Sequence, residues 1–473
     1  MKRIHYIIAL AVFAAASVSA FGQQNLRTAY FLDGYTYNYK MNPAMAPERA
    51  FFATPGMGNL GVGVESNMAL STFLYPTGKG NLTTFMNNSV SSDQFLDRLQ
   101  TANNLNVSVN ETLFATGYRI GKSFHTVDVS LKANASAILP KDLFAFIKNG
   151  SAAGATSWDV SRTGIRSNAI MELAYGYSRP ISDWIRVGAR FKVLMGIARA
   201  DVLIDDLNLK MDGQEWAVTA HGNAEVSGPF SVGTVSGTNE VDMGNVKLPD
   251  IKAISEYLVN PSIGIAVDLG ASFDFLDYFT ASVSVLDLGF VGWKSTTSAV
   301  MPGGKWSFDG FDNISFGEEG GINEEFDQLG ESLGSMLKME ITDNNITKSN
   351  SLAATVHAAF EARMPFYERL SFGILGTQRI DGIYSWTEGR LSANVAPTNW
   401  LSLAASYAIS NFGNSVGGVF NIHLPGLNLY AGLDSFLPMM NVTPQYIPID
   451  SFNTNLTFGI TFTFGKAVGR YRE

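Results

Sequence analysis

The chain has 473 residues, of which 46% are hydrophobic and only 16% are charged, and its mean hydropathy is +0.07. It contains no cysteine, which excludes disulfides, thiolate metal sites and a lipidated N-terminal cysteine. The formal net charge of −9 argues against a nucleic-acid partner. This composition fits neither a disordered chain nor a bundle of membrane helices.

The first residues have the features of a secretory signal peptide. Lys2 and Arg3 supply positive charge, residues 7–16 are apolar, and small residues lead to a cleavage site expected after Ala20, or else after Gly22. The alternative is an uncleaved anchor, but the apolar run is shorter than the roughly 20 residues that a membrane-spanning helix needs. We therefore predict that residues 1–20 are removed and that the mature chain leaves the cytoplasm.

Long stretches of the chain alternate between apolar and polar residues, as β-strands with two different faces do. The clearest run is Trp184 to Ile197, in which apolar residues alternate with Arg186, Gly188, Arg190 and Lys192. About 9 to 11 residues are enough for a tilted strand to cross a bilayer, and this run is longer. With about fifteen candidate strands and the even number typical of bacterial barrels, we predict an all-β, transmembrane antiparallel β-barrel of 14 strands, with 16 as the alternative.

The last predicted strand is rich in phenylalanine. Its apolar face alternates with Asn, Thr and Gly and includes Phe458, Phe462 and Phe464. A terminal amphipathic strand of this kind resembles the signal that the outer-membrane barrel assembly machinery recognises. We predict that these three residues form such an assembly signal.

Charged residues are scarce near the C-terminus. Between residues 391 and 465 the only Asp, Glu, Lys or Arg residues are Asp434 and Asp450. This pattern suits strands with a lipid-facing apolar side, because a charge at the bilayer midplane costs roughly 2 to 4 kcal/mol. We expect the lumen of this half of the barrel to be polar but uncharged.

Four short connections between predicted strands resemble one another and suit periplasmic turns. Trp184, Tyr278 and Trp400 begin the strands after three of them, and we predict that these side chains form an interfacial aromatic girdle. The four connections are residues 179–184, 275–278, 365–369 and 397–400.

Three segments break the strand pattern and are predicted to be short helices: Ser91 to Gln100, Lys141 to Lys148 and Glu324 to Met339. The last has apolar residues at helical spacing beside several carboxylates, as an amphipathic helix requires. We expect it in an extracellular loop rather than in the lumen, and we expect a structural role rather than ligand gating.

Two sequence motifs suggest an enzyme but lack the context that the chemistry needs. Residues 56–61 match the dinucleotide fingerprint G-x-G-x-x-G, yet a strand rather than a helix is predicted to follow. Residues 413–417 match the nucleophile elbow, yet strands are predicted on both sides. A barrel-surface lipase using His357 or His423 is the one enzyme class left open. We predict no enzyme activity, no cofactor and no metal site.

Part of the sequence resembles a known group of proteins. The segments Asn42 to Pro47, Pro55 to Leu60 and Phe73 to Pro76 look like the N-terminal signature of uncharacterised Bacteroidota outer-membrane barrels of unknown function, which are similar to FadL-type transporters. Residues 284–293 and 407–433 also resemble this group and the PorV and PorP barrels associated with type IX secretion.

The resemblance implies a monomeric outer-membrane barrel at residues 58–473, preceded by an N-terminal plug segment at residues 21–57. In this interpretation Asn42, Pro43, Ala44 and Pro47 shape the plug, and the barrel binds hydrophobic small molecules or lets them pass passively. A scaffold or shuttle for a secreted or surface protein, as the PorV likeness implies, and a purely structural barrel are the alternatives. The expected partners are outer-membrane lipid and the barrel assembly machinery.

Overall fold

The computed structural model describes residues 25–54, 58–77, 81–149, 157–211, 216–247, 250–301, 303–308, 338–436 and 453–468. The predicted signal peptide lies outside these ranges, as does nearly all of the helix predicted at Glu324 to Met339.

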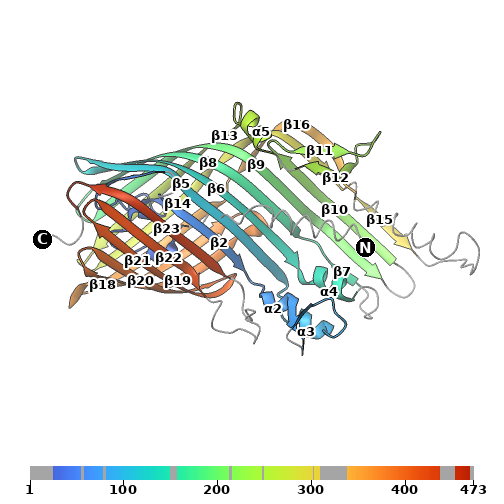
Figure 1. Cartoon of the computed structure of the whole chain (residues 1–473), viewed down its shortest axis with the longest axis horizontal. Helices are drawn as coiled ribbons and strands as arrows, with labels where there is room; N and C mark the ends of the chain where they lie inside the picture. Colours follow the sequence, from blue (N-terminus) through green and yellow to red (C-terminus); the bar gives the residue numbers. More distant parts are fainter. Residues whose placement is uncertain are drawn as a thin grey trace, which may run out of the picture.

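Fourteen antiparallel strands close into a barrel, as the alternation predicted (Figure 1). The first strand is interrupted and consists of β1 and β2, and the eighth consists of β16 and β17. β23 closes the barrel by pairing with β1 and β2. In order around the barrel the strands are β1 Ala50–Ala53 with β2 Leu60–Ser66, β5 Ala102–Ile120, β6 Ser123–Pro140, β8 Thr163–Pro180, β9 Ile185–Met211, β13 Ser262–Phe275, β14 Phe279–Val300, β16 Glu340–Ser351 with β17 Ala354–Met364, β18 Tyr367–Ile380, β19 Trp386–Thr398, β20 Leu401–Ser410, β21 Gly413–Leu424, β22 Leu427–Phe436 and β23 Thr454–Phe464.

Tight turns gather at one end of the barrel, which we call the turn end. Residues 121–122, 181–184, 276–278, 365–366, 399–400 and 425–426 join consecutive strands there, and these include all four connections predicted to be short. The other end, which we call the loop end, carries the long connections. Bacterial barrels place short turns in the periplasm and long loops outside, so the turn end corresponds to the periplasmic side.

The barrel wall is uneven in height. β5, β6, β8, β9 and β14 have 18 to 27 residues, whereas β19 to β23 have 10 to 13. We call these two groups the long wall and the short wall. At the loop end the long wall is extended by β7 Ser157–Asp159, β10 Trp216–Ser227 and β15 Gly304–Phe308 (Figure 1). Trp158, Leu207, Leu209 and Val218 form an apolar cluster there.

Short elements fill the connections. α3 and α4 fall within two of the segments predicted to be helical, and the Ser91 hydroxyl caps α3 by accepting a hydrogen bond from the Gln94 amide at 3.1 Å. The short elements are η1 Arg27–Ala29, η2 Thr36–Lys40, α2 Leu70–Phe73, β3 Leu74–Pro76, β4 Leu82–Thr84, α3 Ser92–Leu96, α4 Lys141–Asn149, β11 Ser231–Thr234, β12 Val241–Lys247, α5 Ile251–Tyr257 and η4 Gly382–Tyr384. Within the described ranges, no helix is both long enough and apolar enough to span a membrane.

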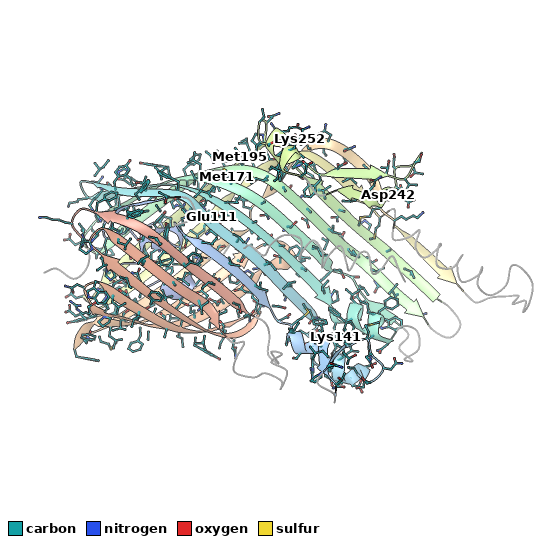
Figure 2. All side chains as sticks on the ribbon, in the orientation of Figure 1. Glu111, Lys141, Met171, Met195, Asp242 and Lys252 are labelled. Atoms are coloured by element: carbon teal, nitrogen blue, oxygen red, sulfur yellow. The ribbon has the colours of Figure 1, made fainter. Side chains whose placement is uncertain are left out.

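The two faces of the wall differ as the sequence pattern requires. On β9, Arg190 and Lys192 are buried on the inner side, whereas Phe191 and Val193 are 49% and 40% exposed on the outer side. Large apolar side chains on the other strands face outward in the same way, and side chains project from both faces of the wall (Figure 2). A continuous apolar outer surface around polar inner positions is the arrangement that a lipid bilayer stabilises, so this is the architecture of an outer-membrane barrel.

Candidate functional site

Residues 25–49, which we call the N-terminal segment, lie inside the barrel (Figure 1). Most of these residues are buried, including charged and polar ones. Aromatic rings form the centre of the segment: Tyr35 packs edge-on against Tyr430 of β22, with ring centroids 4.8 Å apart, and Tyr37 contacts Phe51 of β1. The segment is therefore packed against the inner wall as a core element would be.

One charged anchor holds the segment to the short wall and to β2. The Arg27 guanidinium lies 2.8 Å from Glu65 of β2, 3.3 Å from Glu388 of β19 and 3.5 Å from Asp434 of β22. All four side chains are buried, and the ring of Trp386 lies 5.1 Å from the guanidinium carbon. A buried cation among carboxylates is stable only while its partners stay in place.

Asp434 also fixes the start of η1. Its two carboxylate oxygens accept hydrogen bonds from the backbone amides of Arg27, at 2.8 Å, and Thr28, at 2.7 Å. Arg390 of β19 donates to the Thr28 hydroxyl at 2.9 Å and to the Asp434 carbonyl at 3.0 Å. These contacts contradict the expectation of an uncharged lumen in this half, because the lone charged residue of β22 faces inward and binds the segment.

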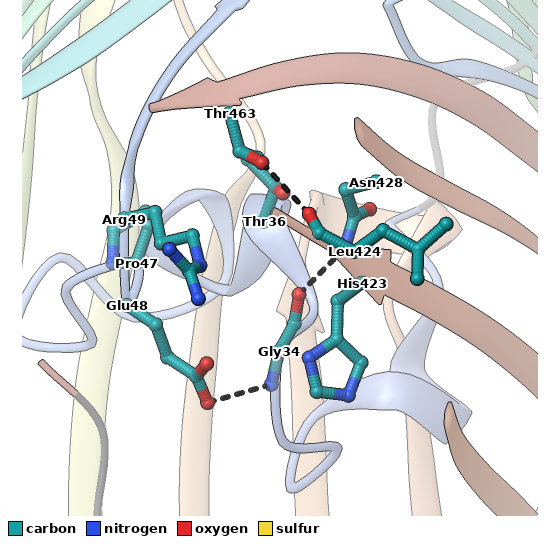
Figure 3. Close-up of a pocket in the computed structure, with 9 residues that line it drawn as sticks. All are labelled: Gly34, Thr36, Pro47, Glu48, Arg49, His423, Leu424, Asn428 and Thr463. Atoms are coloured by element: carbon teal, nitrogen blue, oxygen red, sulfur yellow. Dashed lines mark hydrogen bonds between the residues drawn. The ribbon is translucent and has the colours of Figure 1, made fainter. Parts of the chain in front are cut away.

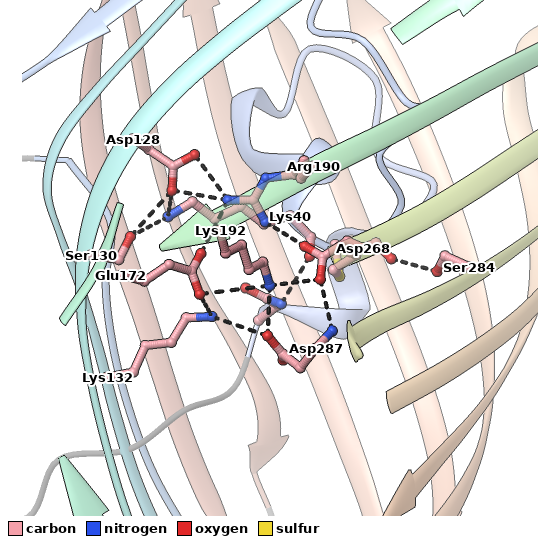
Figure 4. A network of polar contacts seen from close by, with 12 residues as sticks. Lys40, Asp128, Ser130, Lys132, Glu172, Arg190, Lys192, Asp268, Ser284 and Asp287 are labelled. Atoms are coloured by element: carbon pink, nitrogen blue, oxygen red, sulfur yellow. Dashed lines mark hydrogen bonds and ion pairs between the residues drawn. The ribbon is translucent and has the colours of Figure 1, made fainter. Parts of the chain in front are cut away.

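A second charged anchor lies against the long wall (Figure 4). The Lys40 ammonium is 3.3 Å from Asp128 of β6 and donates hydrogen bonds to Thr112 at 2.7 Å and Ser130 at 2.8 Å. Asp128 is shared with Arg190 of β9, at 3.0 Å. The Lys40 anchor thus joins a network that the wall already contains.

That wall network of cations and carboxylates extends across five neighbouring strands, β6, β8, β9, β13 and β14. Arg190 also contacts Glu172 of β8 and Asp268 of β13, at 3.3 and 2.8 Å. Lys192 reaches Asp268 at 2.7 Å and Asp287 at 2.6 Å. Lys132 reaches Glu172 at 2.6 Å. With Lys40 in place, four cations face four carboxylates, so the described network is electrically balanced.

Asn42 anchors the segment by hydrogen bonds to the backbone of the wall. Its amide nitrogen donates to the Tyr30 hydroxyl at 3.2 Å and to the carbonyls of Ala271 at 3.3 Å and Val283 at 3.4 Å. Its side-chain oxygen accepts from the Ala44 amide at 3.0 Å, which closes a local turn around Pro43.

Glycines in the wall make room for this turn. A Cβ atom on Gly188 of β9 would lie 2.1 Å from the Pro43 carbonyl oxygen, and one on Gly270 of β13 would lie 2.1 Å from the Asn42 side-chain oxygen. Real Cβ atoms do not approach other atoms so closely. The wall and the segment therefore fit each other only because these two positions lack a side chain.

The barrel wall is interrupted beside the segment. β1 pairs with residues 462–464 of β23, and β2 pairs with residues 454–458, so residues 459–461 have no partner among the described residues of the first strand. The Asn59 carbonyl accepts from the Thr112 amide at 2.8 Å, and its side chain hydrogen-bonds the Tyr430 hydroxyl inside the barrel. Asn59, which directly precedes β2, thus contacts the lumen.

A small pocket lies between the segment and the short wall near the turn end (Figure 3). Its lining includes Gly34, Glu48, His423 and Asn428, and its free volume of about 20 Å³ is enough for one or two water molecules. A second pocket, beside Pro43 and Arg190, has about 10 Å³. Neither is large enough for an organic ligand in this state.

His357, His423 and the residues that match the nucleophile elbow all lie in barrel strands. His357 shares a 3.0 Å hydrogen bond with the Thr377 hydroxyl, and His423 shares one of 2.9 Å with the Ser402 hydroxyl. Residues 413–417 begin β21 directly after a hairpin turn, so the nucleophile-elbow match is a strand. In the part of the chain that the structure describes, no three His, Asp or Glu residues are grouped as a metal site would require.

The other predicted site residues lie in the turns of the turn end and on the outer face of β23. Trp184 and Trp400 are 57% and 45% exposed and Tyr278 is half-buried, and all three lie at the turn end. Phe458, Phe462 and Phe464 face outward along β23. Their roles as a girdle and as an assembly signal stay predictions.

The structure buries all four residues predicted to shape the plug: Asn42, Pro43, Ala44 and Pro47. The predicted plug range of residues 21–57 also contains β1, which pairs with β23 in the barrel wall. Sequence reasoning missed Arg27, Lys40 and their carboxylate partners. One signal was available, because Asp434 is an isolated charge in a long uncharged stretch and such a residue needs a partner if it is buried.

Comparison with solved structures finds barrels of low sequence identity. The chain is similar to the toluene transporter TbuX of Ralstonia pickettii, at 9% identity over 94% of this chain and 97% of that one, with a TM-score of 0.42. It is also similar to the Pseudomonas putida toluene transporter TodX (9%, 94% and 98%, TM-score 0.40) and to a Pseudomonas aeruginosa FadL homologue (12%, 94% and 99%, TM-score 0.40).

A comparison with the curated proteins finds no match. Residues 43–434 match a family model that is described as a family of unknown function, DUF5723. The match covers far more than half of the chain and includes every strand of the barrel except β23, so the chain belongs to the DUF5723 family.

Proposed function

We propose that this protein is an outer-membrane barrel in which the N-terminal segment acts as a plug and past which hydrophobic small molecules move passively. The observation that carries the proposal is the position of the segment: it lies in the lumen and is anchored at two places, by Arg27 to β2 and the short wall and by Lys40 to the long wall. Residues 25–49 do not pair with the wall as a strand, so the segment can shift without breaking the strand pairing that closes the barrel.

The interruption between β1 and β2 supports a sideways exit. A lumen wall lined with ion pairs offers an apolar solute little apolar surface to pack against, whereas the bilayer core is apolar throughout. At residues 459–461, β23 has no partner among the described residues of the first strand, and the bilayer lies directly outside. A molecule that passes the segment would reach lipid there by the shortest path.

The test is to replace residues 42–47 by a Gly/Ser linker in the full-length protein and to measure liposome permeability. We expect a small polar dye to leak faster, because the Asn42 and Pro43 contacts hold the segment against the wall. Uptake of a hydrophobic fluorescent probe should also rise. Circular dichroism serves as the control that the barrel persists. Unchanged permeability to both probes with an intact barrel would refute the plug.

A second candidate is a scaffold for a secreted or surface protein. It is favoured by the loop-end projection beside β12, where Ile251 of α5 and the nearby Val259 are 87% and 86% exposed. Figure 2 shows Asp242 and Lys252 on the same projecting elements. Stoichiometric co-purification of a protein that is lost in an Ile251→Asp, Val259→Asp variant would establish this role, and its absence together with probe uptake would favour passage of small molecules.

A further inference from the structure

The outer surface at the turn end of β5, β6 and β8 carries a row of aromatic side chains. Tyr118 of β5 is paired with His125 of β6, and His125 is paired with Tyr177 of β8, so the three lie side by side on adjacent strands. The rings of Tyr118 and His125 are stacked, with centroids 5.5 Å apart and planes 9° apart. His125 and Tyr177 are 5.3 Å apart in an edge-on arrangement.

A second, polar row lies one step closer to the turn. Ser123 of β6 is paired with Arg179 of β8 by the same register, which places Phe124 opposite Ser178. The Ser123 hydroxyl donates to the Tyr177 hydroxyl at 3.1 Å, and Tyr177 is also hydrogen-bonded to Arg179. Lys122 lies in the adjoining turn and is exposed. The two rows together with this lysine are called the tyrosine–arginine patch.

The two cations of this patch have no acidic partner among the described residues. Arg179 is exposed on the outer face, and neither it nor Lys122 is part of an ion pair there. The inner face of this part of the wall is different, because Lys132 of β6 and Arg190 and Lys192 of the neighbouring β9 each meet one or more carboxylates. An unpaired cation beside lipid is stable only at the level of the head groups, where it can meet an anion.

We propose that the tyrosine–arginine patch binds the phosphate of an anionic phospholipid in the periplasmic leaflet. A guanidinium recognises phosphate oxygens through two parallel hydrogen bonds, and the hydroxyls of Ser123 and Tyr177 lie beside it. Two cations without a neighbouring carboxylate favour a head group that brings no amine of its own. The aromatic row then covers the first part of the acyl chains.

The patch differs from the predicted aromatic girdle because one of its rings, Tyr177, is hydrogen-bonded to Ser123 and Arg179. Trp184 and Trp400 are exposed rings at the same end, and within the described residues no cation lies over either ring. The proposal concerns the outer face alone, so it does not depend on what the lumen carries.

The experiment is native mass spectrometry of the full-length protein in detergent, with equal amounts of phosphatidylglycerol and phosphatidylcholine added. We expect one phosphatidylglycerol molecule to be retained in preference to phosphatidylcholine. The double variant Lys122→Gln, Arg179→Gln should reduce that retention roughly tenfold, because each basic residue contributes to holding an anionic head group. Tyr177→Phe should cause a smaller loss.

Lys466→Gln is the matched control, because Lys466 is an exposed cation at the same end of the barrel that follows β23, and β1 separates that strand from β5. It should leave retention unchanged. Equal retention of the two lipids by the wild type would overturn the proposal, as would equal retention of phosphatidylglycerol by the double variant. Complete displacement of the lipid by millimolar glycerol phosphate would also overturn it, because the site would then recognise free phosphate rather than a membrane lipid.

Discussion

The two charged anchors of the N-terminal segment differ in how much charge the wall leaves for the segment to neutralise. At the Arg27 anchor the wall contributes three carboxylates and one other cation, Arg390. At the Lys40 anchor the described wall network has four carboxylates and already three cations. Loss of Arg27 thus takes an ion-pair partner from three buried carboxylates, whereas loss of Lys40 takes one from Asp128, which keeps its contact with Arg190.

The comparison teaches that the two ends of the segment are held for different reasons. The short wall forms an acidic site that needs the segment to be stable, whereas the long wall forms a nearly complete network to which the segment adds one ion. Breaking a buried pair by removing one partner costs more when the remaining charges have no other partner. The Arg27 anchor should therefore be the stronger of the two.

Arg27→Ala should have the largest effect. Removing the guanidinium takes an ion-pair partner from each of the buried carboxylates Glu65, Glu388 and Asp434, and we expect a loss of about 3–5 kcal/mol in the free energy of unfolding. Urea unfolding in detergent micelles measures it. Arg27→Lys, which keeps the charge, should recover much of the loss. An Arg27→Ala protein as stable as the wild type would remove the basis of the comparison.

Lys40→Ala should cost less, about 2–3 kcal/mol, because Asp128 keeps its contact with Arg190. The same unfolding measurement applies. Adding Asp128→Asn sharpens the result, since the double variant should be less destabilised than the two single losses combined. If Lys40→Ala destabilised the protein as much as Arg27→Ala, the contact of Asp128 with Arg190 would not be compensating for the lost ammonium.

Gly188→Ala tests the long-wall anchor by packing alone, without changing a charge. The new Cβ would meet the Pro43 backbone at about the position of its carbonyl, so we expect a loss of about 1–2 kcal/mol and a displaced segment. Proteolysis of the segment should become faster. Gly389→Ala is the control, because a Cβ there meets no atom within 4 Å. Equal behaviour of the two variants would mean that the turn at Pro43 adapts freely.

Asn42→Ala should have the smallest effect, about 1 kcal/mol, because its wall contacts are long hydrogen bonds of 3.3 and 3.4 Å. Amide hydrogen exchange at Ala44 should accelerate, since that amide loses the Asn42 oxygen as its acceptor. Asn42→Asp, which retains an acceptor for Ala44 but loses the donated bonds, separates the two contributions. Unchanged exchange in Asn42→Ala would show that the local turn does not depend on this side chain.

The sequence by itself determined the class of fold, because a barrel strand is a local pattern. The alternation from Trp184 to Ile197 requires one apolar and one polar face whatever lies beside it, and β9 has those faces. The turn at residues 276–278 and the helices α3 and α4 also follow from local signals.

The tertiary structure decided what the polar face of each strand does. The sequence around an inward polar residue does not show which residue it will contact: Asp434 binds Arg27, 407 positions away, and Tyr30 binds Ser282, 252 positions away. Those meetings depend on barrel closure and on strand register, which are set by the whole sheet. On the outer face the same register aligns Tyr118, His125 and Tyr177. Alternation tells which side of the wall a residue faces, and only the closed barrel tells which residue it faces there.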